Sequence, residues 1–305
     1  MQLKDIRSEN HFDKPVLERS HLSSSIADPT AIQARSGPYQ AATEPFLKWA
    51  GGKRWALPVL QKLVPPNYKR YIEPFLGGGS LFFSLGCNDA VLSDVNFELI
   101  NAYRTVRDNH EQLDRWLAVF QKWHNPELYY KIRSRDHGSK FWSALRFIYL
   151  NRTCFNGIYR VNLKGKFNVP IGTKDRISYP DGLRTYAAAL CNVTIKHADF
   201  QSILRYAKSG DFVYVDPPYT VKHNNNGFIK YNEHLFKWSD QIRLRDEIRR
   251  AQDRGAYIVV SNAAHDSIFE LYKNVGEIIR VERSSVLAAA PNFRRRELEV
   301  VIKCY

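Results

Sequence analysis

Apolar and polar positions alternate in two distinct ways along most of this chain. From Phe46 onward, short apolar runs bounded by turn residues predict seven β-strands, at Tyr71–Phe75, Ala90–Ser93, Val193–Lys196, Phe212–Val215, Tyr257–Val260, Ile278–Glu282 and Leu298–Cys304. Other stretches repeat their apolar residues with the spacing of a helix, at Leu81–Leu85, Phe97–Val106, His234–Gln252 and Ser267–Tyr272. Strands that alternate with helices are typical of an α/β fold with a mostly parallel sheet.

The chain between Ser93 and Val193 does not follow this alternation. It contains three further helical patterns, at Leu113–Phe120, Glu127–Arg135 and Lys140–Leu150. After them, a segment rich in Gly, Asn and Tyr, Asn151–Pro170, predicts a β-hairpin. We therefore expect a second domain that is inserted into the sheet domain.

The N-terminal segment has a different composition from the rest. Residues 1–42 are polar, lack apolar periodicity and are interrupted by serine and proline residues, which predicts a loosely ordered arm. The expected organisation is therefore an arm (1–42), a first part of the sheet domain (43–100), the insertion (101–185) and a second part of the sheet domain (186–305).

The chain is strongly basic, and much of its excess charge falls in the predicted insertion. Its 305 residues include 45 Lys and Arg against 31 Asp and Glu, a net charge of +14. Between Lys131 and Arg176 there are eleven basic residues and two acidic ones, with aromatic residues interleaved. A solvated basic face is one interpretation. A surface that grips a nucleic-acid backbone and stacks on bases needs the same mixture, so double-stranded DNA is the expected partner.

Other functional classes receive no support from the sequence. No stretch approaches the roughly 20 apolar residues that span a bilayer, and no secretory signal pattern opens the chain. We therefore expect a cytoplasmic protein with no membrane association. The nine histidines form no HxxxH-type cluster, so no metal site is expected. The cysteines are scattered without a CxxC pair and predict reduced thiols, at Cys87, Cys154, Cys191 and Cys304.

The strongest local motif is the tetrapeptide Asp216-Pro217-Pro218-Tyr219, directly after the predicted strand Phe212–Val215. In an open parallel sheet, ligands bind beyond the carboxyl ends of the strands. The prolines stiffen this loop, and an ordinary proline-rich turn is the alternative interpretation. Hydrogen bonds from the amine of a planar base to the Asp216 carboxylate and the Pro217 carbonyl would aim the nitrogen lone pair at a methyl donor. Tyr219 would stack on the base.

A second motif, EPFLGGGS, occupies Glu73–Ser80 after another predicted strand. Glycines at a strand-to-helix turn let the backbone approach a ligand closely. Asp94 follows Gly77 by seventeen positions, near the offset at which a carboxylate reaches the ribose of a nucleotide. The spacing is not the GxGxxG of dinucleotide sites, so a smaller adenosine ligand is favoured. A third motif, the basic and aromatic turn at Phe46–Arg54, lacks Walker spacing and by itself fits a ligand loop or a helix cap.

In this order, KWAGGK, EPFLGGGS and DPPY closely resemble the motifs of Dam-type (D12 class) DNA adenine methyltransferases. The resemblance extends from about Phe46 to Tyr305. It implies a class I S-adenosylmethionine-dependent methyltransferase fold, Rossmann-like with a mostly parallel sheet, and a helical plus β-hairpin target-recognition insertion. It also implies S-adenosyl-L-methionine as the donor and transfer to adenine N6 in duplex DNA by base flipping and direct in-line attack.

The resemblance also implies roles for individual residues. Asp94 would hold the ribose of the donor, and Asp216 would contact both its methionine end and the target adenine. The implied catalytic residues are Asp216, Pro217, Pro218 and Tyr219. The implied cofactor-binding residues are Trp49, Lys53, Glu73, Phe75, Gly77, Gly79, Asp94 and Asp216.

Residues of the insertion would contact DNA. In relatives that methylate GATC, the aromatic at the Phe155 position wedges into the base stack and the arginine at the Arg160 position reads a base. The resemblance therefore implies GATC, or a longer site that contains GAT, as the recognition sequence. The implied DNA-binding residues are Lys48, Arg152, Phe155, Asn156, Arg160, Lys164 and Lys166.

Several alternatives stay open from the sequence. Transfer to cytosine N4 or to a glutamine side chain is associated with SPPY or NPPY, whereas this chain has Asp216. A non-catalytic DNA-binding module is the competing interpretation from another class. The expected protein is a monomer, with a restriction endonuclease acting on the same site as an optional partner. The long arm and the Asn-rich segment Thr220–Phe228 depart from the family pattern.

Overall fold

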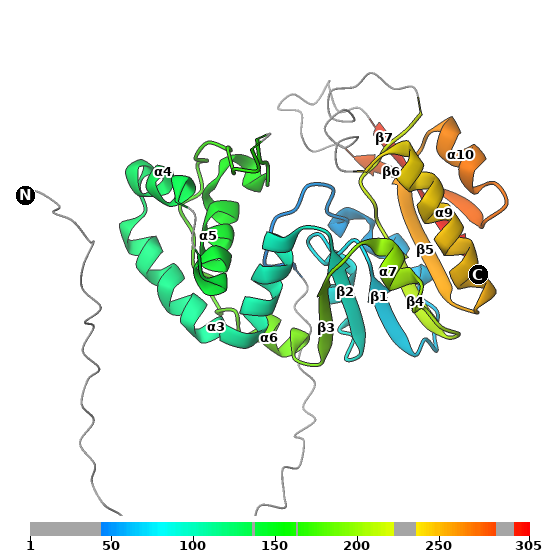
Figure 1. Ribbon diagram of the computed structural model, residues 1–305, viewed down its shortest axis with the longest axis horizontal. Coiled ribbons are helices and arrows are strands. Elements are labelled where there is room, and N and C mark those ends of the chain that lie inside the picture. The colour runs from blue at the N-terminus through cyan, green and yellow to red at the C-terminus, as the bar shows by residue number, and fades with distance from the viewer. Residues whose placement is uncertain (1–43, 136–137, 163, 223–235, 285–295) are drawn as a thin grey trace, which may run out of the picture. The chain divides into compact units, whose positions relative to one another are not determined.

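The computed structural model describes residues 44–135, 138–162, 164–222, 236–284 and 296–305. The predicted arm and most of the Asn-rich segment after Tyr219 lie outside these residues. All seven predicted strands are confirmed (Figure 1): β1 Arg70–Glu73, β2 Ala90–Asp94, β3 Val193–His197, β4 Asp211–Val215, β5 Tyr257–Ala263, β6 Glu277–Ser284 and β7 Arg296–Cys304.

The strands form one sheet in the order β3-β2-β1-β4-β5-β7-β6. Neighbours from β3 to β5 are parallel. Strand β7 runs antiparallel to both β5 and β6, between which it lies. This mostly parallel sheet confirms the predicted class I methyltransferase fold. The strand order reverses between β1 and β4, which places their following loops at the edge where α/β sheets bind ligands.

The core has two parts because successive residues of a strand point to opposite faces of the sheet. Tyr71, Phe212 and Tyr214 belong to one cluster, whereas Val213 and Val215 belong to the other. Helices α2 (Ser80–Leu85) and α3 (Phe97–Trp123) contribute to the first cluster. Helices α7 (Phe200–Leu204), α9 (Trp238–Asp253) and α10 (Asp266–Tyr272) contribute to the second, and Figure 1 shows α7 and α9 in front of the strands.

The insertion is built mainly from α3, α4 (Pro126–Ser134), α5 (Lys140–Thr153) and α6 (Arg184–Leu190). Helix α5 packs against both α3 and α4. Element α3 contains the two predicted helical patterns, Phe97–Val106 and Leu113–Phe120, on either side of a kink at Asn109 (φ −140°, ψ 30°). The predicted domain boundary at 100/101 falls inside the helix before this kink.

The predicted β-hairpin is only partly formed. Helix α5 continues to Thr153, and the 3₁₀ helix η3 (Phe155–Gly157) follows it. Antiparallel pairing in this part is confined to two isolated bridges, Val161 with Phe167 and Cys154 with Ile171. Successive left-handed backbone angles at Asn156 (φ 55°) and Gly157 (φ 65°) interrupt the extended conformation that a regular strand requires.

Three short helical elements precede the sheet, η1 (Arg54–Ala56), α1 (Leu57–Leu60) and η2 (Gln61–Leu63). They follow the KWAGGK motif directly, so this motif is held at the start of a helical turn. Helix α9 begins at Trp238, and the predicted start at His234 lies outside the described residues. Among the described residues, no helix is long and apolar enough to cross a membrane.

Candidate active site and nucleic-acid interface

The loops after β1 and β4 lie side by side because these two strands are neighbours in the sheet. Their register pairs Tyr71 with Phe212 and Ile72 with Val213. The glycine-rich motif follows β1, and the tetrapeptide follows β4. The two motifs therefore reach the same edge of the sheet, where ligands of α/β proteins bind.

Asp216, the first residue after β4, pairs with Lys53 of the first motif. The ammonium nitrogen of Lys53 lies 2.9 Å from Oδ1 of Asp216 and 3.7 Å from Oε2 of Glu299. It also donates a hydrogen bond to the carbonyl of Gly51 at 2.7 Å. Only 4% of Lys53 is exposed, so carboxylates rather than water offset its charge. One buried ammonium group thus joins two motifs that are far apart in the sequence.

Tyr219 is oriented by the same group of charges. Its hydroxyl donates a hydrogen bond to Oε2 of Glu299 at 2.6 Å, and the Lys53 ammonium lies 4.7 Å from the centre of its ring. Pro217 is buried and Pro218 is half-buried between these two polar residues. The ring of Tyr219 is therefore fixed at its hydroxyl end, which suits a side chain that offers its face to a planar base.

Sequence analysis missed Glu299, which lies in β7 opposite Ala263 of β5. Its signal was a single acid ahead of the apolar run Val300–Ile302 near the end of the chain. An acid at the start of an apolar strand has many structural explanations, so the pattern alone did not connect it to the active site.

The protonation state of Asp216 follows from two opposing effects. Burial raises the pKa of Asp216 to about 6, while the Lys53 ammonium acts to lower it. The carboxyl is therefore mostly ionised at neutral pH and can accept hydrogen bonds from an amine. The result agrees with the role that the DPPY motif predicts.

Glu73, the first residue of EPFLGGGS, is buried and faces inward. The hydroxyl of Tyr71 donates a hydrogen bond to its Oε2 at 2.9 Å. Burial raises the pKa of Glu73 well above its usual range, and the charges of Asp216 and Asp94 add to the rise. Glu73 is therefore harder to ionise than an exposed glutamate, and it lies close enough to Asp216 and Asp94 for their charges to act on it.

The glycine turn, Trp49 and Asp94 form one cradle. The backbone N–H of Gly77 donates to Oδ2 of Asp94 at 3.1 Å, and Asn96 N–H donates to Oδ1 at 2.9 Å. Gly77 has φ 47°, and a Cβ at this position would lie 2.8 Å from Cδ1 of Trp49. Gly79 also has a positive φ of 66°. Only glycine allows this backbone to come so close to the indole ring.

Phe75 adds an aromatic wall from the other side of the loop. Its ring stacks on Phe200 at 5.4 Å with an angle of 24° between the planes. The preceding residue, Asp199, caps α7 and pairs with Arg243 at 3.0 Å. The sequence pattern did not single out Asp199 and Phe200, which lie three and four positions after the end of the predicted strand at Val193–Lys196.

The residues at this edge fit an adenosine-containing methyl donor. Trp49 and Phe75 supply flat apolar surfaces, Asp94 supplies a carboxylate of the kind that binds ribose hydroxyls, and the turn at Gly77 lets the indole of Trp49 pack directly against the backbone. The structure joins Lys53 with Asp216 and Trp49 with Gly77 and Asp94, and the binding of the donor by these residues stays a prediction. Clusters of three or more potential metal ligands do not occur among the described residues.

Lys48 lies where the first motif touches the insertion. Its backbone N–H donates to the Asn151 side chain at 3.0 Å, and the amide of Asn151 donates back to the Lys48 carbonyl at 2.7 Å. A close contact with the Lys174 ammonium and partial burial lower the pKa of Lys48. Two neighbouring cations suit an anionic partner such as the DNA backbone. Lys174 was not among the predicted DNA contacts.

The predicted base-reading residues lie on an exposed part of the insertion. Phe155 is 53% exposed, and Asn156 beside it has a left-handed backbone. Arg160 is exposed, and its Nε donates to the side chain of Asn168 at 2.9 Å. An exposed apolar ring at Phe155 and a guanidinium at Arg160 that is held by Asn168 are compatible with a wedge and a base reader.

Two of the remaining predicted DNA contacts share the turn after Arg160. Lys164 and Lys166 are exposed, and their backbone N–H groups donate to the Asn162 side chain at 2.9 and 3.0 Å. Arg152 is placed differently. It donates to the carbonyls of Arg176 and Ser178 at 3.1 and 3.2 Å, and its guanidinium lies 4.0 Å from the centre of the Tyr179 ring. These contacts hold Arg152 within the insertion, and its DNA contact stays a prediction.

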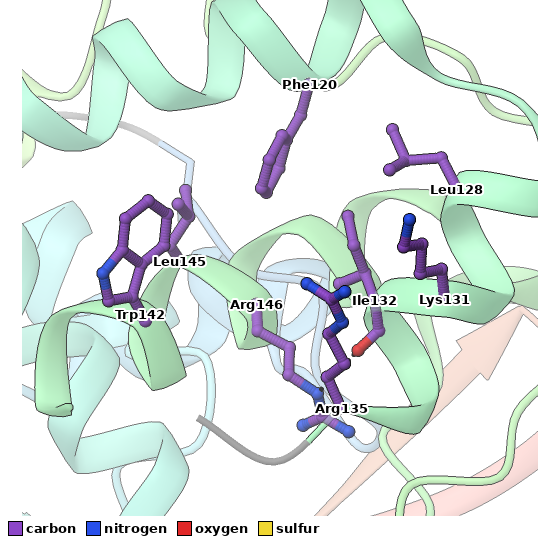
Figure 2. Close-up of a pocket in the computed structure, with 8 residues that line it drawn as sticks. All are labelled: Phe120, Leu128, Lys131, Ile132, Arg135, Trp142, Leu145 and Arg146. Atoms are coloured by element: carbon purple, nitrogen blue, oxygen red, sulfur yellow. Dashed lines mark hydrogen bonds between the residues drawn. The ribbon is translucent and has the colours of Figure 1, made fainter. Parts of the chain in front are cut away.

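A separate cavity of about 260 Å³ lies inside the insertion (Figure 2). It is lined by Arg135, which follows the end of α4, and by residues of α3, α4 and α5, namely Phe120, Leu128, Lys131, Ile132, Trp142, Leu145 and Arg146. Arg146 at its base donates to the carbonyls of Ile132 and Arg133 at the end of α4. None of the lining residues belongs to the three motifs, so this cavity is distinct from the donor site.

Comparison with known proteins identifies relatives over most of the chain. The family model described as D12 class N6 adenine-specific DNA methyltransferase matches residues 49–286. The type II methyltransferase M1.LlaDCHI of Lactococcus lactis subsp. cremoris is 38% identical over 271 residues, which cover 86% of this chain and 95% of that protein. The DNA adenine methylase of Haemophilus influenzae is 32% identical over 266 residues, which cover 84% of this chain and 92% of that protein.

Proposed function

The chain belongs to the D12 class of N6 adenine-specific DNA methyltransferases, and we propose that it acts at GATC, or at a longer site containing GAT, in duplex DNA. It transfers a methyl group to N6 of adenine in DNA. S-adenosylmethionine supplies the methyl group from an electrophilic sulfonium centre. A cytoplasmic monomer is part of the same proposal, and so is a restriction endonuclease that acts on the same site.

The observation that carries the proposed chemistry is the pairing of Asp216 with Lys53 at the end of β4. An aromatic amine is a poor nucleophile because its lone pair is delocalised into the ring. The Asp216 carboxylate and the Pro217 carbonyl accept hydrogen bonds from the amine and favour a lone pair directed away from the ring. With the donor bound, the amine nitrogen would take its methyl group, and the proton released from this nitrogen would pass to the Asp216 carboxylate or to solvent.

Lys53 and Glu299 have supporting roles in this chemistry. Lys53 keeps Asp216 in its accepting, ionised form, since it lies 2.9 Å from the carboxylate. Glu299 holds the Tyr219 hydroxyl at 2.6 Å, so the ring has a defined orientation against the target base. Both groups act before the transfer step, by setting charge and geometry in advance.

The target adenine must leave the helix, because its amine is paired inside the duplex. Phe155 is the exposed ring that can fill the vacated space in the stack. Arg160 supports the choice of GATC, since an arginine fork can donate to both O6 and N7 of guanine. The bond from its Nε to Asn168 orients the guanidinium, whose two terminal nitrogens are the pair that such recognition uses.

Methylome sequencing of a methylation-deficient bacterial host that expresses the chain tests the proposal. Wild type should methylate adenine within GATC or a GAT-containing site. Arg160→Ala should relax specificity at one base pair of that site, because a good bidentate contact discriminates by about 1–3 kcal/mol. Lys164→Ala is the matched control and should weaken methylation of all sites about equally.

A wild-type motif without GAT would refute the proposed sequence. An Arg160 variant that modifies the same motif with unchanged stringency would make Arg160 a phosphate contact. Methylated cytosine in place of adenine would contradict the family assignment itself.

A further inference from the structure

Tyr159 is the point at which the donor site and the DNA-reading segment are in direct contact. Its ring stacks on Trp49 at 5.5 Å with an angle of 21° between the planes. It also packs against Phe147 at 5.4 Å and Phe167 at 5.9 Å within the insertion. Its hydroxyl donates a hydrogen bond to Oε2 of Glu98 at 2.6 Å. Both neighbours in the sequence, Ile158 and Arg160, are exposed, so Tyr159 alone among the three points inward.

Tyr159 has two partners outside the aromatic cluster that it forms with Phe147 and Phe167, namely Trp49 and Glu98. Trp49 lies against Gly77, where even a Cβ would approach it to 2.8 Å. Glu98 is in the first turn of α3, just after the segment in which Asp94 accepts the Gly77 N–H. Tyr159 therefore contacts Trp49 of the cradle through its ring, and it contacts Glu98, four residues after Asp94, through its hydroxyl.

The backbone of Tyr159 continues directly into the proposed base reader. The carbonyl of Arg160 accepts a hydrogen bond from Asn168 N–H at 3.2 Å, and Val161 bridges to Phe167. The Arg160 side chain is tied to the same Asn168. One peptide unit therefore separates the ring that contacts Trp49 from the arginine that Asn168 holds.

We propose that Tyr159 is a positioning residue that couples occupancy of the donor site to recognition of the DNA sequence. The inference rests on the proposed function, because it takes Trp49 as a cofactor contact and Arg160 as a base reader. A ligand against Trp49 restricts the indole ring. The stack then restricts Tyr159 and the segment that carries Arg160. This segment therefore loses part of its conformational entropy when the donor binds, and it loses less when DNA binds afterwards. Coupling of this kind is reciprocal, so cognate DNA should tighten donor binding by the same factor.

The contacts of Tyr159 can be separated by substitution. A phenylalanine would keep the stack and the packing of the ring, so the hydroxyl has a separable role. Its bond to Glu98 sets how far the ring reaches over Trp49. Glu98 also lies 3.5 Å from Arg146, so the acceptor is itself held in place. Tyr159→Phe removes the hydroxyl contact alone, and Tyr159→Leu removes the stack as well.

The test measures binding of a fluorescent duplex that carries the mapped methylation site, with and without S-adenosylhomocysteine. For wild type, we expect the non-reactive product to tighten cognate binding by about 5- to 150-fold. It should leave a duplex with one changed base pair nearly unaffected. In Tyr159→Leu the tightening should fall below twofold, and Tyr159→Phe should lie between the two. Tyr130→Leu is the matched control, because Tyr130 is 41% exposed on α4, and it should retain the wild-type factor.

Wild-type protein without coupling would overturn the inference, and so would full coupling in Tyr159→Leu. Circular dichroism shows whether Tyr159→Leu folds. If it does not, the test uses Tyr159→Phe and Glu98→Gln instead, and unchanged coupling in both variants would refute the inference. Calorimetry with S-adenosylhomocysteine alone distinguishes the two levels of proposal. A wild-type protein that binds no S-adenosylhomocysteine, or methylates no site, refutes the proposed function together with this inference. If wild type binds S-adenosylhomocysteine and methylates its site, and the Tyr159 variants keep the wild-type coupling, only the inference about Tyr159 is refuted.

Discussion

Replacing Lys53 by methionine should move the acid limb of the pH–activity profile toward higher pH. Asp216 must be ionised to accept hydrogen bonds from the adenine amine, and its pKa of about 6 already includes the favourable effect of Lys53. At the observed 2.9 Å, two opposite charges attract by about 6 kcal/mol for an effective dielectric constant of about 20. This gross value corresponds to about 4 pKa units.

The net shift should be smaller, because water can enter and because Glu299 loses the same cation at 3.7 Å. A neighbouring opposite charge typically changes a carboxyl pKa by about 1–3 units. Wild type should therefore lose activity as the pH falls through about 6. The Lys53 variant should lose it about one to three units higher, so that it is weak at neutral pH and partly restored in alkaline buffer.

Glu299→Gln provides the opposite perturbation. The negative charge of Glu299 raises the pKa of Asp216, so its removal should shift the acid limb to lower pH. Glutamine keeps an oxygen that can accept the Tyr219 hydroxyl bond. Lys53 and Glu299 both act on the carboxyl of Asp216, so the two substitutions should move its pKa in opposite directions. A general loss of folding would not produce shifts of opposite sign.

Single-turnover transfer of a radiolabelled methyl group, at saturating duplex and donor between about pH 5 and pH 9, measures these limbs. Lys62→Met is the control, since Lys62 is exposed on η2, and it should keep the wild-type profile. An acid limb that stays in place in both Lys53→Met and Glu299→Gln would show that Asp216 is not the titrating group.

Three further predictions concern individual steps. Asp216→Ala should abolish transfer yet change duplex affinity by less than about tenfold, because phosphate contacts dominate binding; near-normal turnover would end its proposed role. Asp94→Ala should weaken S-adenosylmethionine binding by about 1.5–3 kcal/mol in calorimetry, with Asp94→Asn as the milder control, and an unchanged dissociation constant would place the ribose elsewhere. A 2-aminopurine at the target position should brighten when the enzyme binds; silence in both wild type and Tyr219→Ala would count against flipping.

The strands were predictable because their signal is local. In a parallel sheet covered on both faces, a strand such as β4 is apolar at nearly every position, and turn residues mark its ends. Structure moved the boundaries by a few residues, mostly where pairing with a neighbour extends a strand beyond its apolar run. The long strand β7, for example, begins at Arg296, two residues before the predicted start.

The irregular parts were less predictable from the same signal. The kink at Asn109 lies between the two predicted helical patterns of α3, so this break could be predicted although its geometry could not. Asn156 takes a left-handed backbone next to Gly157, so the expected hairpin becomes a 3₁₀ turn with isolated bridges. Asparagine tolerates such angles better than most residues, but its presence alone does not say whether it will adopt them.

The sequence by itself determined the fold class, the family and the three motifs, because each of these depends on residues that are neighbours along the chain. Tertiary structure decided which distant side chains complete the site. Glu299 reaches Tyr219 only because β7 lies beside β5, and Tyr159 meets Trp49 only because the insertion folds back on the first motif. The tertiary structure also decided the partners of Arg152, whose guanidinium donates to two carbonyls of the insertion. A single acid or aromatic carries no local pattern, so its role depends on burial and on partners that only the assembled sheet and insertion supply.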